Sequence, residues 1–188
     1  MARSVASTIS YRAWAGINLL NAENMFIVVG QTSDWGSEPT PDTADPTDTT
    51  PTEPVVAIAP YLKTLAVEVT AEAYALLDPG AGSVLTISGI VKYFEHISEA
   101  NAYTRGATYL IATANYDLAT HPAPSTDGFR SYYLCVGLEP SLGHTEDDWL
   151  APENIEDYGT LLYINNGPEI PITGGEFSCD LVCLFEMR

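Results

Sequence analysis

Residues 109–138 constrain the fold of this chain most strongly, because they combine two strand-like stretches with a turn signal between them. Residues 109–116 and 129–138 are rich in aromatic and β-branched side chains, which favour strands. Residues 121–128 contain two prolines and an Asp-Gly pair, which are typical of turns. Neither strand carries a nucleophile beside a base, a phosphate-binding loop or a cluster of metal ligands. This stretch therefore predicts a β-rich fold and leaves the function open.

The N-terminal part of the chain predicts one helix followed by a buried strand. Residues 11–21 have helical periodicity, and Ser10 is the expected N-cap. Tyr11 and Trp14 share one face of this helix, which we expect to pack on a sheet, with Trp14 in the core. The short apolar run at residues 25–30 predicts a buried strand.

Alternating or apolar stretches predict further strands, at residues 55–59, 64–70, 84–93, 160–164 and 177–187. Residues 66–77 would also suit a helix, although we favour a strand for 64–70. We expect Gly89 to form a bulge or kink, residues 97–105 to be a loop or a short helix, and turns to lie at residues 78–82, 165–167 and 174–175. The chain is therefore predicted to be mainly β, as a β-sandwich or a mixed α+β fold, with one N-terminal helix.

Residues 37–54 differ in composition from the rest of the chain. They contain five prolines, six threonines and five acidic residues, including Asp42, Asp45 and Asp48. Such a segment buries little apolar area, so we expect a long, solvated acidic loop or linker. The alternative is that it docks on a basic groove of a partner. The expected organisation is thus an N-terminal helix and first strand at 1–36, the acidic segment at 37–54, and a β-rich body at 55–188.

The charge of the chain disfavours several classes of partner. Its 25 Asp and Glu residues against 7 Lys and Arg give a formal net charge of -18 and a pI near 4.1. Such a charge repels phosphates and anionic lipid head groups, so we expect no direct nucleic-acid binding. We also expect no membrane insertion, because no segment approaches the roughly 20 apolar residues needed to span a bilayer. The N-terminus has no apolar run that resembles a signal peptide. The odd number of cysteines, Cys135, Cys179 and Cys183, predicts small buried apolar side chains and no disulfide framework.

No group of residues predicts a catalytic, cofactor-binding or metal-binding site, and we expect no enzymatic activity. His144, Glu146, Asp147 and Asp148 lie together but lack the ligand order of a calcium loop, so a solvated acidic turn is favoured. The three histidines are too scattered to form a zinc site with two of the cysteines. Trp35 and Trp149 stand beside acidic residues and prolines in expected loops, where tryptophan either makes contacts with partners or covers the core.

The order of three segments resembles that of a known class of proteins. Residues 26–41 form a strand that ends in Gly, then Thr-x-x-Trp and a Pro-rich stretch. Residues 91–140 contain Phe129-Arg130 and then Gly137-Leu138, and residues 159–188 contain a Leu- and Tyr-rich strand, an Asn/Pro/Ile element and a last amphipathic strand. This order resembles structural tail proteins of tailed bacteriophages, and is most similar to baseplate wedge proteins of contractile-tailed phages.

The resemblance implies a non-enzymatic structural subunit, made in the host cytoplasm and built into the virion. It implies a position in a baseplate wedge, or in the neck as a tail-completion component. The implied partners are other phage tail or neck proteins, and copies of the chain itself in a symmetric ring. The candidate interface residues are Trp35, Phe129, Arg130, Tyr132, Tyr133, Trp149, Phe177 and Phe185.

Two alternatives from other functional classes stay open at this point. A β-sandwich module could bind carbohydrate through Trp35, Trp149 and surface tyrosines. A hydrolase could use a pair of carboxylates, although the sequence singles out no pair.

Overall fold

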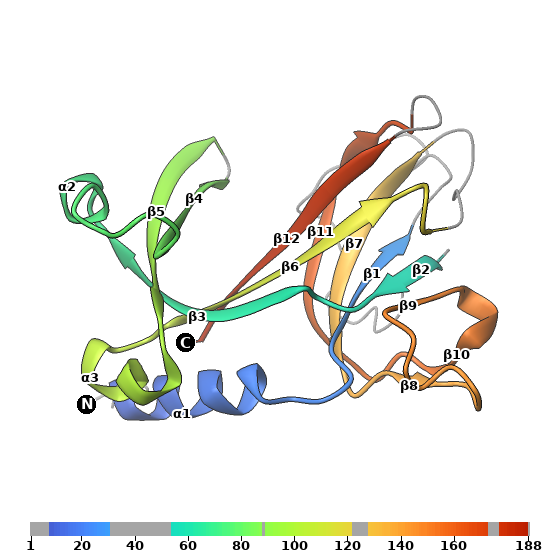
Figure 1. Ribbon diagram of the computed structural model, residues 1–188, viewed down its shortest axis with the longest axis horizontal. Coiled ribbons are helices and arrows are strands. Elements are labelled where there is room, and N and C mark those ends of the chain that lie inside the picture. Colours follow the sequence, from blue (N-terminus) through green and yellow to red (C-terminus); the bar gives the residue numbers. More distant parts are fainter. Residues whose placement is uncertain (1–7, 31–53, 88, 122–127, 173–176, 188) are drawn as a thin grey trace, which may run out of the picture. The chain divides into compact units, whose positions relative to one another are not determined.

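The computed structural model describes residues 8–30, 54–87, 89–121, 128–172 and 177–187, and over these residues the chain is mainly β, as predicted (Figure 1). The strands are β1 (Phe26–Gly30), β2 (Pro54–Ile58), β3 (Leu62–Val69), β4 (Gly82–Ile87), β5 (Ile90–Ile97), β6 (Tyr109–Asp117), β7 (Phe129–Val136), β8 (Glu139–Pro140), β9 (Trp149–Leu150), β10 (Ile155–Asp157), β11 (Thr160–Ile170) and β12 (Ser178–Glu186). The helical elements are α1 (Ile9–Leu20), α2 (Ala71–Tyr74), η2 (Glu99–Asn101), α3 (Ala102–Arg105) and η3 (Pro152–Asn154). The acidic segment lies outside the described residues up to position 53, as does the turn expected at 174–175, and Pro54 begins β2.

The first sheet contains five strands in the order β11-β7-β1-β2-β9, and its neighbouring strands are antiparallel. β1 lies in the middle of the sheet and all five of its residues are buried, as predicted for this apolar run. Val28 of β1 is opposite Tyr133 of β7 on one side and Ala57 of β2 on the other. A strand that is covered on both faces reads as a continuous apolar run, which explains the sequence of β1.

The second sheet has the strand order β12-β6-β3-β5-β4, and β8 and β10 form a separate antiparallel pair. The two strands predicted at residues 109–116 and 129–138 are both present, as β6 and β7. They belong to different sheets, because β7 pairs with β1 and β11. The chain between β6 and β7 therefore connects two sheets.

The chain forms two compact units, each built from separated segments. Unit 1 comprises Met1–Asn21, Lys63–Ala112 and Leu184–Arg188, and unit 2 comprises Ala22–Leu62 and Thr113–Cys183. β6 and β12 each supply residues to both units. This grouping differs from the linear division into 1–36, 37–54 and 55–188, which stays a prediction.

Helix α1 of unit 1 begins at Ile9, two residues earlier than predicted, and its N-cap is Thr8 instead of Ser10. The Thr8 hydroxyl oxygen accepts a hydrogen bond from the Tyr11 backbone N–H at 3.1 Å, which satisfies one of the free donors of the first turn. The buried residues of α1 are Ala13 and Gly16, whereas Trp14 is 54% exposed, so the prediction that Trp14 belongs to the core was wrong.

The small residues explain which face of α1 is buried. A Cβ added to Gly16 would lie within 2.9 Å of side-chain atoms of Leu65 and Met187. The helix therefore approaches these side chains more closely than a larger residue would permit, and its bulky aromatic residues face away from the contact.

Two other expectations were wrong in their local geometry. The strand predicted at residues 84–93 is an antiparallel hairpin of β4 and β5, in which Ile87 pairs with Ile90 and Gly89, with φ 78°, lies in the turn. The turn expected at 165–167 lies inside β11, whose register with β7 shifts between Asn166 and Ile170. The strand favoured over a helix at 64–70 is confirmed as β3, and a single helical turn, α2, follows it.

Within unit 2, aromatic side chains of β6 pack against the first sheet in a sandwich-like arrangement. The Tyr116 ring is fully buried, with its centroid 5.4 Å from that of Phe129 on β7 and 6.4 Å from that of Phe177. The Tyr132 hydroxyl of β7 donates to the Val182 carbonyl of β12 at 3.3 Å. These contacts join the two layers of unit 2 through both apolar area and a hydrogen bond.

We predict that Gly159→Ala destabilises the protein by about 3 kcal/mol or more. Gly159 has a positive φ of 67°, and a Cβ there would meet the Val136 carbonyl oxygen and lie 2.6 Å from the Gly137 carbonyl. The matched control is Gly137→Ala, which has a φ of 70° but open space around the added Cβ. The control should lose only about 1 kcal/mol. Urea unfolding measures both, and equal losses would contradict the crowding at Gly159.

We also predict that Cys135 and Cys183 resist thiol reagents in the folded protein. Both side chains are fully buried. Burial raises the pKa of Cys135 to about 12 and moves the pKa of Cys183 upward as well, so neither forms thiolate near neutral pH. Alkylation followed by mass spectrometry should label both rapidly in urea and slowly in its absence. Rapid labelling of Cys135 in the folded protein would contradict its burial.

Candidate interaction surfaces

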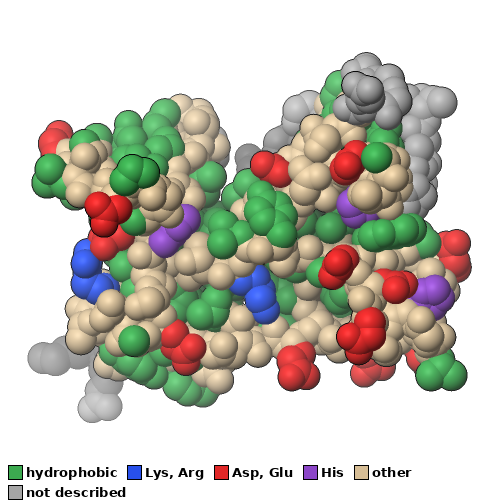
Figure 2. Space-filling model, in the orientation of Figure 1, with side chains coloured by type: hydrophobic (Ala, Val, Ile, Leu, Met, Phe, Trp, Pro, Cys, Tyr) green, Lys and Arg blue, Asp and Glu red, His purple; other side chains and the backbone are tan. Residues whose placement is uncertain are grey.

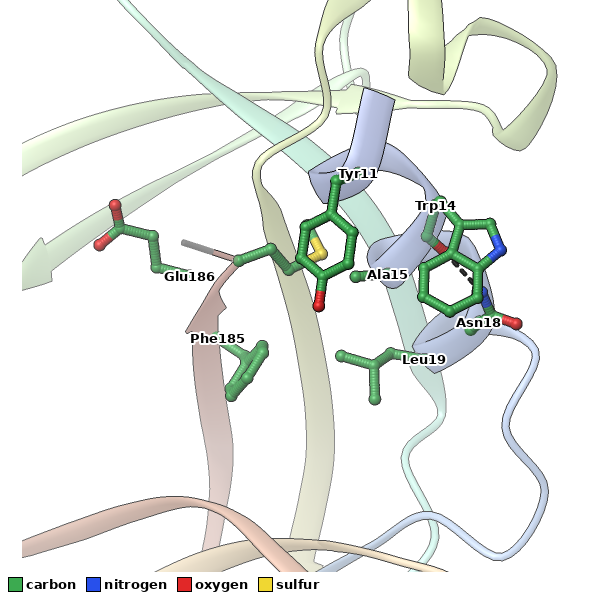
Figure 3. A pocket seen from close by; sticks show the side chains of 8 residues that line it. Tyr11, Trp14, Ala15, Asn18, Leu19, Phe185 and Glu186 are labelled. Atoms are coloured by element: carbon green, nitrogen blue, oxygen red, sulfur yellow. Dashed lines mark hydrogen bonds between the residues drawn. The ribbon is translucent and has the colours of Figure 1, made fainter. Parts of the chain in front are cut away.

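An apolar groove lies on unit 1 between α1 and the end of β12, and we call it the α1 groove (Figure 3). Its volume is about 350 Å³. The residues that line it are Tyr11, Trp14, Ala15, Asn18, Leu19, Phe185, Glu186 and Met187. Because the small residues of α1 face inward, its large residues are left to form the wall of this groove.

The α1 groove presents aromatic side chains to solvent. Tyr11 and Trp14 are each 54% exposed, and their ring centroids are 6.0 Å apart. The Asn18 side-chain amide donates to the Trp14 backbone carbonyl at 2.7 Å, so this polar group is bonded to its own helix (Figure 3). Glu186 is the acidic residue of the lining. Such a surface can bury an apolar segment, and it offers no pair of groups for acid–base catalysis.

A second groove lies within unit 2, and we call it the acidic groove. It has a volume of about 540 Å³. Its lining consists of Ile58, Ala59, Pro60, Tyr61, Asn115, Asp117, Thr120, His121, Asp148 and Trp149. These residues come from the end of β2 and the loop that follows it, the end of β6 with the turn that follows it, and the start of β9 with the residue before it.

Hydrogen bonds fix the turn after β6. The His121 backbone N–H donates to the Asp117 carbonyl at 2.8 Å, and the Ala119 N–H donates to the Asp117 carboxylate at 2.9 Å. The His121 ring atom Nδ1 lies 2.8 Å from the Asp117 carbonyl oxygen and 2.9 Å from the Thr120 hydroxyl. The imidazole is therefore held through one of its two nitrogens.

The same imidazole supports the exposed tryptophan of the acidic groove. The His121 ring stacks on Tyr116 with centroids 5.5 Å apart, and it meets Trp149 in an edge-to-face contact at 5.7 Å. Tyr116 is fully buried, His121 is 9% exposed and Trp149 is 38% exposed. The rings of Tyr116, His121 and Trp149 therefore contact one another in turn from the core to the surface, and these contacts restrict the position of the Trp149 indole at the groove.

Carboxylates border the acidic groove. Asp117 and Asp148 belong to its lining. Asp180 accepts a hydrogen bond from the Asn115 amide at 2.9 Å. Burial and the neighbouring Asp180 carboxylate, which accepts a hydrogen bond from the Tyr61 hydroxyl, raise the pKa of Tyr61.

The net negative charge of the chain lies in unit 2. Unit 1 contains six Lys or Arg and six Asp or Glu, so its formal net charge is zero. Unit 2 contains nineteen Asp or Glu and one Arg, so it carries the whole charge of -18. Figure 2 shows acidic side chains spread over the region of β8, β9 and β10 on the face that it presents. The two grooves therefore lie in very different electrostatic surroundings.

The candidate interface residues of β7 are mostly buried. Phe129 and Tyr133 are core side chains, and Tyr132 is partly buried, with its hydroxyl accepting from the Asn165 amide at 2.6 Å. Arg130 is 9% exposed and donates to the Glu169 carboxylate at 2.7 Å. The strand was predicted because residues 129–138 are rich in aromatic and β-branched side chains, and this enrichment does not distinguish a buried face from an exposed one.

The other candidate residues divide between the two grooves and the core. Trp149 lines the acidic groove and Phe185 lines the α1 groove. Phe177 packs against Tyr116, and Trp35 lies outside the described residues. A role for all eight in subunit contacts stays a prediction. Tyr11 and Tyr61 were not singled out from the sequence as surface residues, nor was His121 as a lining residue of a groove, although the small pair Ala13 and Gly16 signals which face of α1 is buried.

No metal centre is found in the described part of the chain. No group of three or more His, Cys, Asp or Glu residues there is arranged to hold an ion. In the acidic turn after β8, Nδ1 of His144 lies 2.8 Å from the Asp147 carboxylate, and both side chains are partly or fully exposed. Among the helices of the described ranges, none has the length and apolar character needed to cross a membrane.

Comparison with known proteins identifies the family of the chain. A search among curated proteins found no match. The family model described as "Baseplate wedge 3 tail fiber network component" matches residues 4–177, which is most of the chain. The resemblance to baseplate wedge proteins of contractile-tailed phages is thereby confirmed. The chain belongs to the family of baseplate wedge 3 tail fiber network components, and it is a structural protein of the phage baseplate that interacts with other baseplate or tail proteins.

Proposed function

We propose that this chain is a wedge subunit of the baseplate that links a neighbouring wedge protein to the tail fibre network. The proposal rests on the family match over residues 4–177, because the description of that family names both the baseplate wedge and the tail fiber network. A wedge position is favoured over the neck or tail-completion position for the same reason. The role consists of holding neighbours together and requires no chemical reaction, and the subunit reaches the virion after its synthesis in the host cytoplasm.

The α1 groove is the contact that we assign to the neighbouring wedge protein. The occupant is an apolar segment of that protein, because the groove exposes Tyr11 and Trp14 around a floor that includes the buried Met187. Tyrosine and tryptophan side chains are enriched among the residues that contribute most binding energy in protein interfaces. Unit 1 is electrically neutral, so the approach of a partner to this groove meets little local repulsion.

A second copy of the chain is a less suitable occupant of the α1 groove. Each copy carries a charge of -18, all of it in unit 2, so two copies repel one another at low ionic strength. We therefore propose that copies arranged in a symmetric ring are joined through other subunits. The same charge repels phosphates, and for this reason we assign the chain no direct contact with nucleic acid.

The double variant Tyr11→Ala and Trp14→Ala tests the α1 groove. In a phage whose own gene is inactivated, the variant supplied from a plasmid should enter purified particles about tenfold less than the wild type, measured by mass spectrometry. Its thermal unfolding should change little, because both side chains are more than half exposed.

The matched control is the double variant Leu76→Ala and Tyr103→Ala. Both residues belong to unit 1 and are 87% and 49% exposed, and neither lines the α1 groove. The control should enter particles as the wild type does. Normal incorporation of the Tyr11 and Trp14 variant would overturn the assignment of this groove.

The position in the tail is tested separately by electron microscopy. Particles assembled without the chain should lack density in the baseplate wedge, and a bound antibody should label the baseplate end of wild-type tails. Labelling at the junction of head and tail would instead support a neck component and contradict the wedge position.

A further inference from the structure

We propose that the acidic groove of unit 2 binds a lysine or arginine side chain from a basic segment of a partner protein. This groove is separate from the α1 groove, and the inference does not depend on the wedge position. It follows from the residues that line the groove and from the distribution of charge over the chain.

The aromatic residues of the acidic groove are suited to bind a cation. Tyr61 is 61% exposed and Trp149 is 38% exposed, and both line the groove. An ammonium or guanidinium group over the face of such a ring is attracted by its negative quadrupole, and the attraction increases when water is excluded. The contact with His121 fixes the Trp149 ring, so little conformational entropy is lost when a ligand packs on it.

The carboxylates supply the matching charge. Asp117 and Asp148 line the groove, and the Asn115 and Tyr61 side chains hold Asp180 beside it. The sequence of unit 2 contains a single Lys or Arg, which is Arg130, and its guanidinium donates a hydrogen bond to the Glu169 carboxylate. Unit 2 therefore has no lysine or arginine to spare for these carboxylates, and a partner can supply one.

The His121 ring offers one further polar contact in the groove. His121 lines the groove and is 9% exposed, and the hydrogen bonds of its ring involve Nδ1. Among the described residues, no group hydrogen-bonds the other ring nitrogen, Nε2. A nitrogen in this position can bond to a backbone or hydroxyl group of a bound segment. The groove thus combines apolar walls, a charged rim and one polar contact, which are the elements of a recognition site for a peptide.

Binding of a short peptide that contains arginine tests the inference on the purified full chain. The reference peptide replaces each arginine by citrulline, which keeps the shape of the side chain and removes its charge. We expect the arginine peptide to change tryptophan fluorescence in a saturable manner and the citrulline peptide to bind at least about tenfold more weakly.

Two double variants separate a specific site from general attraction to a negative protein. Asp117→Asn with Asp148→Asn removes two charges inside the groove, and Glu153→Gln with Glu156→Gln removes two charges elsewhere in unit 2. The first should weaken binding of the arginine peptide about tenfold, and the second should change it less than about twofold. Asn at position 117 retains an oxygen that can accept from the Ala119 N–H, and circular dichroism confirms that each variant is folded.

Other outcomes would overturn the inference. Equal weakening by the two double variants would show attraction to the net charge alone. A saturable fluorescence change with a maltooligosaccharide, together with none for the arginine peptide, would assign the groove to carbohydrate. Absence of binding by the arginine peptide to the wild-type chain would exclude a basic ligand at this groove.

Discussion

Burial of β1 between β2 and β7 is the interaction on which the rest of unit 2 depends. This unit carries the whole net charge of the chain, so its surface groups repel one another and oppose the compact state. The opposing term is apolar burial, and β1 supplies five buried residues at the centre of the first sheet. The residues packed around it include Tyr133, Cys135 and Leu150, from strands on both sides of it. A strongly anionic surface is therefore tolerated because an uninterrupted apolar strand lies beneath it.

The sequence predicted individual strands better than their arrangement. β1 follows from an apolar run, β12 from alternation, and β6 and β7 from their aromatic and β-branched residues, all of which are local properties. That β6 and β7 belong to different sheets is a matter of long-range pairing, and local periodicity does not encode it. The ends of helix α1 were predicted to within two residues, but its buried face was predicted wrongly. Large apolar residues were taken as the core, whereas the close approach of α1 requires the small Ala13 and Gly16.

The interaction surfaces were predictable only in part, for a related reason. Residue type selected Trp149 and Phe185, and each lines a groove, but it also selected Phe129 and Tyr133, which fill the core. An aromatic side chain is equally suited to both locations, so its sequence neighbours do not decide between them. The acidic groove joins residues that are far apart in the chain, such as Tyr61 and Trp149. The separation of charge is partly visible in the sequence, because residues 13–62 and 131–187 contain no Lys or Arg, but that most of these residues form one unit appears only after the segments are grouped in space.

The discontinuous composition of the two units affects how such a protein can change between phages. Unit 1 is assembled from three separated stretches of the chain and unit 2 from two. A single crossover in the gene cannot exchange one unit for that of a relative, because at least one stretch of the other unit would be carried with it. A single crossover therefore cannot give one unit a new partner while leaving the other unit unchanged, whereas substitution at the surface of one unit can.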